Sequence, residues 1–242
     1  MSDFFKFETN DIDFPFYNGT PQLDLKDWIA LLLGAIAEVF LIFGLVYFIP
    51  NAEYLPDEIF PILYLLVLII PVAYVCRGKL GLLFRKPELN DIKVIILCYI
   101  LYSIFVIAMG LLLSQTGIST SANSTEIANK VEVLPIILMF IQLLGEELFK
   151  FTIFILTMAT TFNFTKNRKL SVIFGIIVTC IIFGLVHLGA YNGNLIQCIA
   201  LIGLGTVITT YPYYKSKNIT NSYILHLMID LIPTLFMIIG FW

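Results

Sequence analysis

Seven long apolar stretches constrain the fold of this chain more than any other feature of its sequence. Of the 242 residues, 59% are hydrophobic and 13% are charged, whereas soluble domains are about 45–50% apolar and about 25% charged. A helix needs about 20 apolar residues to cross a bilayer. The stretches lie at residues 28–49, 58–76, 92–113, 134–160, 170–191, 195–212 and 220–241. The sequence therefore predicts an all-α fold: a polytopic membrane helical bundle of about seven transmembrane helices with short loops.

The distribution of basic residues predicts how this bundle is oriented. With the N-terminus inside, the inner regions hold 12 of the 14 Lys and Arg residues, and the outer loops hold only Lys130. Cytoplasmic loops of membrane proteins carry such an excess of basic residues. The inner basic residues are Lys6, Lys26, Arg77, Lys79, Arg85, Lys86, Lys93, Lys166, Arg168, Lys169, Lys215 and Lys217. We therefore expect the N-terminus to lie inside.

The overall charge excludes nucleic acid as a partner. The 14 Lys and Arg residues face 17 Asp and Glu residues, which gives a formal net charge of −3. Proteins that bind nucleic acid carry a clear basic excess on one face. The lipid bilayer is therefore the first partner that the composition predicts.

The first 91 residues divide into a leader and two predicted spans. Residues 1–27 form a polar, mildly acidic leader that contains several aromatic residues. A cleaved signal peptide begins with a short basic region, whereas this leader is long and acidic. We therefore expect an uncleaved N-terminal leader, followed at residues 28–91 by two additional transmembrane helices and a basic inner loop.

Ionisable side chains inside the predicted spans are the main functional signal. A charged group at the centre of a bilayer costs at least about 2.5–3.5 kcal/mol, so such groups are rare and usually functional. Six of the seven such residues fall in the fourth, fifth and seventh stretches. The seven are Glu38, Glu146, Glu147, Lys150, His187, His226 and Asp230.

The fourth stretch carries two adjacent carboxylates and a lysine. On a helix, Glu146 and Glu147 point about 100° apart. Lys150 follows them by four and three residues, so it can reach either carboxylate. Glu38 stands alone in the first stretch, and three roles are open for it: a direct part in the chemistry, a counter-charge for Lys150, or a place in the wall of a polar cavity.

The two histidines each have a partner one helical turn away. Phe183 precedes His187 by four residues, and Asp230 follows His226 by four residues. Carboxylates and imidazoles that converge in an apolar cavity can activate a water molecule, because a carboxylate is a stronger base there than in water. The same groups could instead bind a divalent metal.

These patterns resemble the CAAX-protease and bacteriocin-processing family of intramembrane endopeptidases, also called the Abi family. Its members carry E-E-x-x-x-R, F-x-x-x-H and H-x-x-x-N/D, each in a membrane helix. The matching positions here are Glu146-Glu147, Phe183 to His187, and His226 to Asp230. The resemblance implies that residues 92–242 form the core that carries the motifs.

The resemblance also implies a role for each of these groups in peptide-bond hydrolysis. Glu146 would activate water with the help of His187, and Glu147 would be a supporting carboxylate. His226 and Asp230 would polarise the carbonyl group and stabilise the oxyanion. No cofactor is expected, because neither histidine belongs to a short zinc-binding motif such as H-E-x-x-H; zinc is the alternative.

One departure from the family pattern concerns its arginine. That position is Phe151 here, and the nearest cation is Lys150, about 100° away around the helix. A lysine can pair with Glu147, but without the bidentate geometry of arginine. Both an active enzyme and an inactive variant are therefore compatible with the sequence.

The sequence and the family resemblance leave three alternative functions for this protein. The first is an intramembrane endopeptidase in the cell membrane of a Gram-positive bacterium, acting on bacteriocins, pheromones, or prenylated or other membrane-bound peptides. The second is a non-catalytic scaffold of the same fold that binds a partner membrane protein, such as a histidine kinase or a cell-wall enzyme. The third is a transporter, which the absence of paired halves with broken helices disfavours.

The depths of the predicted site residues agree only in part. With a rise of 1.5 Å per residue, Glu146 and His226 are expected at similar depths. His187 is expected about 10 Å nearer the outer face, if its helix is regular to residue 191. Helix tilt, or unwinding near Gly184 and Gly189, would bring it closer to the other two.

Overall fold

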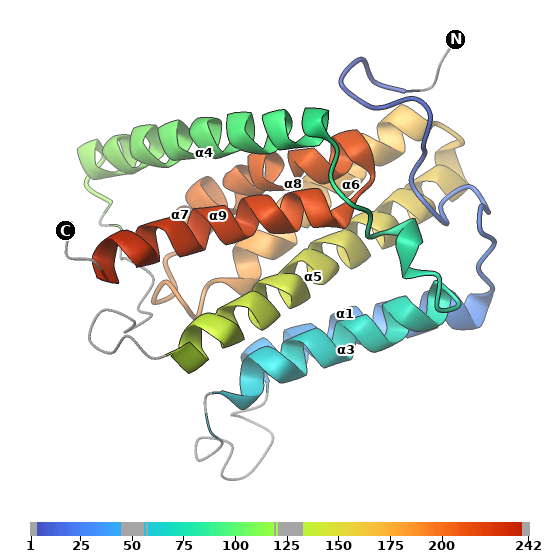
Figure 1. Ribbon diagram of the computed structural model, residues 1–242, viewed down its shortest axis with the longest axis horizontal. Helices are drawn as coiled ribbons and strands as arrows, with labels where there is room; N and C mark the ends of the chain where they lie inside the picture. Colours follow the sequence, from blue (N-terminus) through green and yellow to red (C-terminus); the bar gives the residue numbers. More distant parts are fainter. Residues whose placement is uncertain (1–3, 45–55, 57, 119, 121–132, 239–242) are drawn as a thin grey trace.

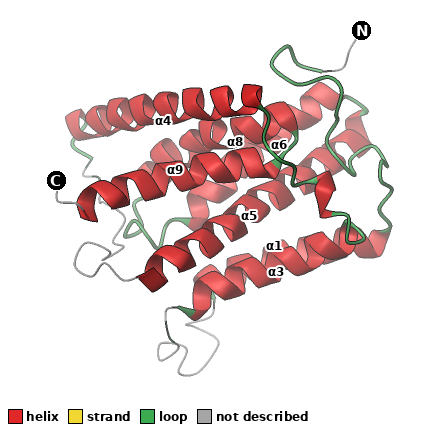
Figure 2. Cartoon of the chain, in the orientation of Figure 1, coloured by secondary structure: helices red, strands yellow, loops and turns green. Residues whose placement is uncertain are grey.

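The computed structural model describes residues 4–44, 56, 58–118, 120 and 133–238, and within these ranges the chain is helical with no strand (Figure 2). Seven long helical segments form the bundle. They are α1 (Leu25–Phe43), α3 (Ile59–Val75), α4 (Leu89–Gln115), α5 (Val133–Thr165), α6 (Arg168–Val186), the composite helix Leu195–Ser216, and α9 (Ile219–Ile238). The predicted all-α helical bundle is confirmed.

Among the described helices, four are long and apolar enough to cross a membrane. These are α4, α6, the composite helix and α9 as far as Phe236. The composite helix consists of α7 (Leu195–Gln197), a π-helical turn (Cys198–Gly203) and α8 (Leu204–Ser216). Helix α3 is apolar but shorter, with 17 residues.

Helix α5 lies at the centre of the bundle (Figure 1). It packs against α1 and α3 on one side and against α6 and α9 on the other. Helix α4 packs on α8 and α9 at the outer edge. Residues of α5 can therefore meet residues of both α6 and α9, which are the two helices that carry the histidines.

Two glycines allow the close packing that positions the site helices. A Cβ atom at Gly145 would lie 3.2 Å from the backbone nitrogen of Leu65 in α3. A Cβ atom at Gly184 would lie 2.7 Å from the carbonyl oxygen of Cys198, which is closer than real side chains approach. Each glycine therefore allows a direct backbone contact next to a site residue, Glu146 in one case and His187 in the other.

The N-terminal leader is part of the core rather than a polar extension. Phe14 and Phe16 are each 1% exposed and belong to the same core cluster as the inner residues of α5 and α8. Glu8 forms buried ion pairs with Arg168 (2.6 Å) and Lys217 (3.0 Å). The leader thus connects the α5–α6 turn to the α8–α9 turn.

The described basic connections lie at the same end of the bundle as the leader (Figure 1). Arg85, in the α3–α4 connection, donates from Nη2 to the carbonyl oxygen of Ser216 at 2.6 Å. Lys169, at the start of α6, lies over the ring of Phe5. This clustering is what an inside N-terminus requires; the predicted outer Lys130 lies outside the described residues.

The orientation can be tested by cysteine labelling. Gln115 and Thr165 are exposed at opposite ends of the bundle, whereas the four native cysteines are buried. Single cysteines at positions 115 and 165 should react with a membrane-impermeant maleimide from opposite sides of the membrane, position 115 from outside. Labelling of position 165 from outside would overturn the orientation.

Three predicted spans end four or five residues away from the predicted position, and the one predicted at 134–160 continues to Thr165. The stretch predicted at 170–191 is wrong beyond residue 186, because α6 ends at Val186 and His187 N–H donates to Gly184 O at 3.2 Å. The turn that follows contains Gly193 with a φ of +74°, which favours glycine. The stretch predicted at 195–212 continues to Ser216. The predicted ends at 45–49 and 239–241 lie outside the described residues.

Candidate active site

Five of the predicted site residues line one cavity: Phe183 and four ionisable residues. The cavity has a volume of about 720 Å³ and is bordered by α3, α4, α5, α6, α8 and α9. Its remaining walls are mainly apolar, and further polar atoms come from Glu58, Gln142, Tyr102, Tyr191 and three threonines. The four ionisable site residues are Glu146, His187, His226 and Asp230.

Glu147 lies behind the cavity wall and connects two helices. Its side chain is 1% exposed and pairs with the ammonium group of Lys150, which is also 1% exposed. The Oε1 atom of Glu147 also lies 2.9 Å from Nδ1 of His226 on α9. Of the two glutamates that Lys150 could reach, it therefore pairs with Glu147.

His226 is oriented by this buried carboxylate. Its Nδ1 atom faces Glu147, so the ring directs Nε2 toward the cavity, 3.8 Å from Glu146 Oε2 and 3.9 Å from Asp230 Oδ2. Asp230 does not accept a hydrogen bond from His226, because 3.9 Å is too long for one. Glu147 occupies the orienting position, and Asp230, with a side chain 39% exposed, faces the cavity.

Glu146 is the carboxylate that reaches the cavity from α5. Its side chain is 17% exposed. The amide Nε2 of Gln142 donates to Glu146 Oε1 at 3.0 Å and leaves Oε2 directed toward His226. Sequence reasoning missed Gln142, although its position four residues before Glu146 places both side chains on one helix face.

His187 lies at the C-terminal end of α6. Its Nδ1 atom is 2.7 Å from the carbonyl oxygen of Phe183, and the two rings are 4.6 Å apart. The Phe183 ring is also 6.5 Å from the ring of His226 and lies 4.9 Å from the ammonium group of Lys150. Because α6 ends one residue before His187, the imidazole reaches the cavity that Glu146 lines. Among the described contacts, His187 and Glu146 do not approach within 4 Å.

Glu38 is separate from this cluster. It is 2% exposed in α1 and does not line the cavity. Within the described part of the chain, its Oε2 atom has no hydrogen-bond partner. The possible role as counter-charge for Lys150 is not observed, because Lys150 pairs with Glu147.

The site does not have the ligand arrangement of a metal centre. A zinc ion needs several His, Cys, Asp or Glu atoms within about 2.0–2.3 Å of one point. Among the described residues, no group of three such side chains could hold a metal ion. The metal-free reaction remains a prediction, and the steps proposed below use only the residues of this chain.

Comparison with known proteins identifies the part of the chain that carries this site. No curated protein and no solved structure matches the chain. The family model described as type II CAAX prenyl endopeptidase Rce1-like matches residues 129–232, a range that includes Glu146, His187, His226 and Asp230. It supports a CAAX-type intramembrane protease in general terms. The family resemblance that the three motifs predicted is therefore confirmed, and the segment 129–232 of this multi-pass membrane protein is Rce1-like.

Proposed function

We propose that this protein is an intramembrane endopeptidase that cleaves membrane-associated peptides or proteins with a water molecule activated by Glu146 and His187. The observation that carries this proposal is that Glu146, Asp230 and both histidines line one largely apolar cavity. Apart from chemistry on a bound substrate, little would justify the cost of placing these groups in the membrane.

The first step is the activation of water between α5 and α6. His187 Nδ1–H donates to the carbonyl oxygen of Phe183, so the Nε2 lone pair is free to accept a hydrogen bond from water. Glu146 Oε2, which its Gln142 contact leaves free, takes the proton of that water. The water oxygen then forms a bond to the peptide carbonyl carbon, and the carbonyl π electrons move onto its oxygen.

The second step is the collapse of this intermediate. His226, held at Nδ1 by Glu147, presents Nε2–H to the oxyanion when the ring is protonated, and a protonated Asp230 is a second donor. The C–N bond breaks as the proton held by Glu146 passes to the leaving nitrogen. The products are a new carboxylic acid and a new amine, Glu146 is again ionised, and the acid then passes its proton to the amine to give a carboxylate and an ammonium group.

The family's arginine position is Phe151 here, and the nearest cation is Lys150. This difference fits an active enzyme better than a non-catalytic scaffold. Lys150 was the main sequence feature in favour of a non-catalytic scaffold. It forms the buried ion pair with Glu147, and Glu147 in turn orients His226. The cation therefore supports the arrangement of the site from position 150, one residue before the family position.

The apolar walls and the volume of about 720 Å³ fit a short extended segment of a membrane-bound peptide. Prenylated peptides, bacteriocins and pheromones remain the proposed substrate classes, in the cell membrane of a Gram-positive bacterium. The test is to incubate the purified protein with a lipid-anchored peptide and the same peptide without its anchor. Cleavage of the anchored peptide supports the proposal, and two intact peptides in the presence of folded protein contradict it.

The role of Asp230 can be tested by comparing Asn and Ala at this position. Asn can donate through its amide, so Asp230→Asn should keep activity within about tenfold, whereas Asp230→Ala should lose about 10²–10³-fold, as when other oxyanion donors are removed. If Asp230 acts as a protonated donor, both Asp230 and His226 contribute to the fall of wild-type cleavage at high pH, and the Asn variant keeps only the fall caused by deprotonation of His226. Equal losses in both variants would exclude an oxyanion role.

A further inference from the structure

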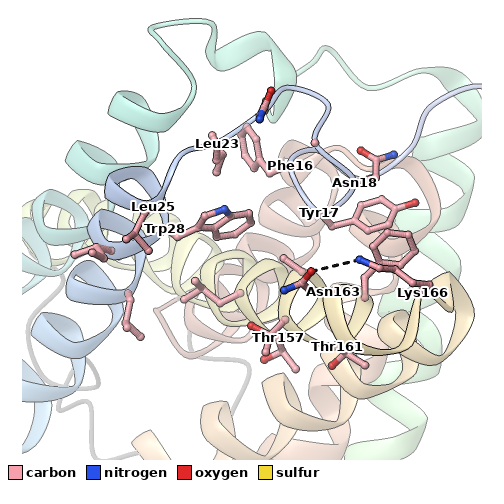
Figure 3. A pocket seen from close by; sticks show the side chains of 18 residues that line it. Phe16, Tyr17, Asn18, Leu23, Leu25, Trp28, Thr157, Thr161, Asn163 and Lys166 are labelled. Atoms are coloured by element: carbon pink, nitrogen blue, oxygen red, sulfur yellow. Dashed lines mark hydrogen bonds between the residues drawn. The ribbon is translucent and has the colours of Figure 1, made fainter.

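A second cavity lies at the basic end of the bundle, beside the leader. Its volume is about 870 Å³, and it is lined by leader residues 16–19, 22 and 23, by the first turns of α1, by α5 residues between Leu156 and Asn163, and by Lys166 just after α5. Figure 3 shows Phe16 and Leu23 of the leader beside Trp28 of α1, with Thr157, Thr161 and Asn163 of α5 on the other side of the cavity. No residue of this cavity belongs to the candidate active site.

One wall of this cavity faces the surroundings of the bundle and is apolar. Leu25, Ile29 and Leu32 lie four and three residues apart, so they share one face of α1. Their exposed fractions are 75%, 44% and 48%. A membrane helix presents such a face to acyl chains, and Trp28 beside it is typical of the membrane–water interface. This wall therefore suits a lipid tail.

The opposite wall is polar and carries one cation. Thr157, Thr160 and Thr161 lie one turn apart on α5, and Asn163 and Lys166 follow them at the end of the helix. Lys166 is exposed, and its Nζ donates to Asn163 Oδ1 at 3.3 Å (Figure 3). Hydroxyl, amide and ammonium donors in this arrangement suit the oxygen atoms of a phosphate group.

No negative charge offsets this cation within the cavity. Among the described residues that line it, none is Asp or Glu. The nearby Asp13 pairs with Arg168 at 2.8 Å, and Asp27 pairs with Arg77 at 2.7 Å. Lys166 is therefore the only charged side chain among the described residues that line the cavity, and an anionic ligand there meets a positive charge.

We infer that this cavity binds one anionic phospholipid of the inner leaflet. The phosphate lies against Lys166 and the threonine hydroxyls, and an acyl chain follows the face of Leu25, Ile29 and Leu32. Because the leader forms one wall, the bound lipid connects the leader to α1 and α5. This inference uses the predicted inside position of the basic end and is independent of the proposed peptidase activity.

Native mass spectrometry of the full-length protein in a non-ionic detergent tests the inference. The probes are phosphatidylglycerol and phosphatidylcholine with the same acyl chains. Phosphatidylglycerol should give a one-lipid adduct at lower concentration than phosphatidylcholine. One basic residue near a membrane surface contributes about 1 kcal/mol to binding of anionic lipid, so Lys166→Gln should weaken phosphatidylglycerol binding about fivefold.

The matched control is Lys93→Gln, because Lys93 is an exposed lysine at the same end of the bundle but does not line the cavity. It should bind phosphatidylglycerol like the wild type. Thr160→Trp, which fills the cavity from an exposed position, should reduce the adduct while the melting temperature is unchanged. Equal binding of the two lipids, or equal effects of the two lysine variants, would overturn the inference. So would a protein dimer in place of the adduct, because a second copy would then occupy the cavity.

Discussion

Replacing Glu146 by Gln is expected to lower the rate of peptide cleavage by about 10²–10⁴-fold, the usual effect of removing a general base. The amide keeps the size of the side chain and its contact with Gln142, but it cannot take a proton from water. His187→Ala should cause a loss in the same range, because it removes the second acceptor for that water. Initial rates with a lipid-anchored peptide measure both effects.

The matched control for this prediction is Glu38→Gln. It makes the same chemical change at another buried membrane glutamate, but Glu38 does not line the cavity. Its activity should stay within about tenfold of the wild type. Melting curves should show all three variants folded, because neutralising a buried carboxylate removes a desolvation cost. A large loss in Glu38→Gln with little loss in Glu146→Gln would place the base on α1.

Replacing Glu8 by Gln is expected to destabilise the protein by about 3–5 kcal/mol, the cost of removing one partner from a buried ion pair. The side chains of Glu8, Arg168 and Lys217 are 0%, 3% and 1% exposed. In the variant, the buried cations of Arg168 and Lys217 lack the negative charge of Glu8. Thermal unfolding in detergent measures the loss. Asp11→Asn, an exposed change in the same leader, should leave the melting temperature unchanged.

This ion cluster also predicts how stability depends on pH. Burial alone would raise the pKa of Glu8, but the hydrogen bonds from Arg168 and from Phe5 N–H outweigh burial and hold it below the ordinary value of 4.5. A carboxyl group whose pKa is lowered in the folded state stabilises the protein at pH values above its unfolded-state pKa. This stabilisation is lost as the pH falls through the folded-state pKa. The melting temperature of the wild type should therefore decrease as the pH falls below about 4.5. The melting temperature of Glu8→Gln should decrease less. Identical acid dependence in both proteins would contradict this role of Glu8.

The periodic and charged features of the sequence predicted most of the fold and the members of the site. Long apolar runs are decisive because the bilayer requires a helix wherever the chain crosses it. Ionisable residues in such runs are rare enough to indicate a site without knowledge of the fold. For this reason Glu146, His187, His226 and Asp230 could be selected from the sequence, and they line the same cavity.

The pairings within the site could not be predicted, because they depend on how the helices pack. Helix spacing made Asp230 the expected partner of His226, but the approach of α9 to α5 brings Glu147 to 2.9 Å from the ring. The depth of His187 was misjudged because a helical pattern does not show that α6 ends at Val186.

The leader shows a second limit of sequence reasoning. Its polar composition gave no sign that Phe14 and Phe16 are core residues. In the same leader, Glu8 forms ion pairs with Arg168 and Lys217, which are 160 and 209 residues away in the sequence. No local pattern encodes contacts of this range.

Incubation of the purified protein with a lipid-anchored peptide in H₂¹⁸O tests the central claim most directly. If water activated by Glu146 attacks the peptide carbonyl, mass spectrometry should find one ¹⁸O atom in the new C-terminal carboxylate, and Glu146→Gln should form almost no product. An intact peptide in the presence of folded wild-type protein would contradict the account. So would labelled product formed equally fast by Glu146→Gln.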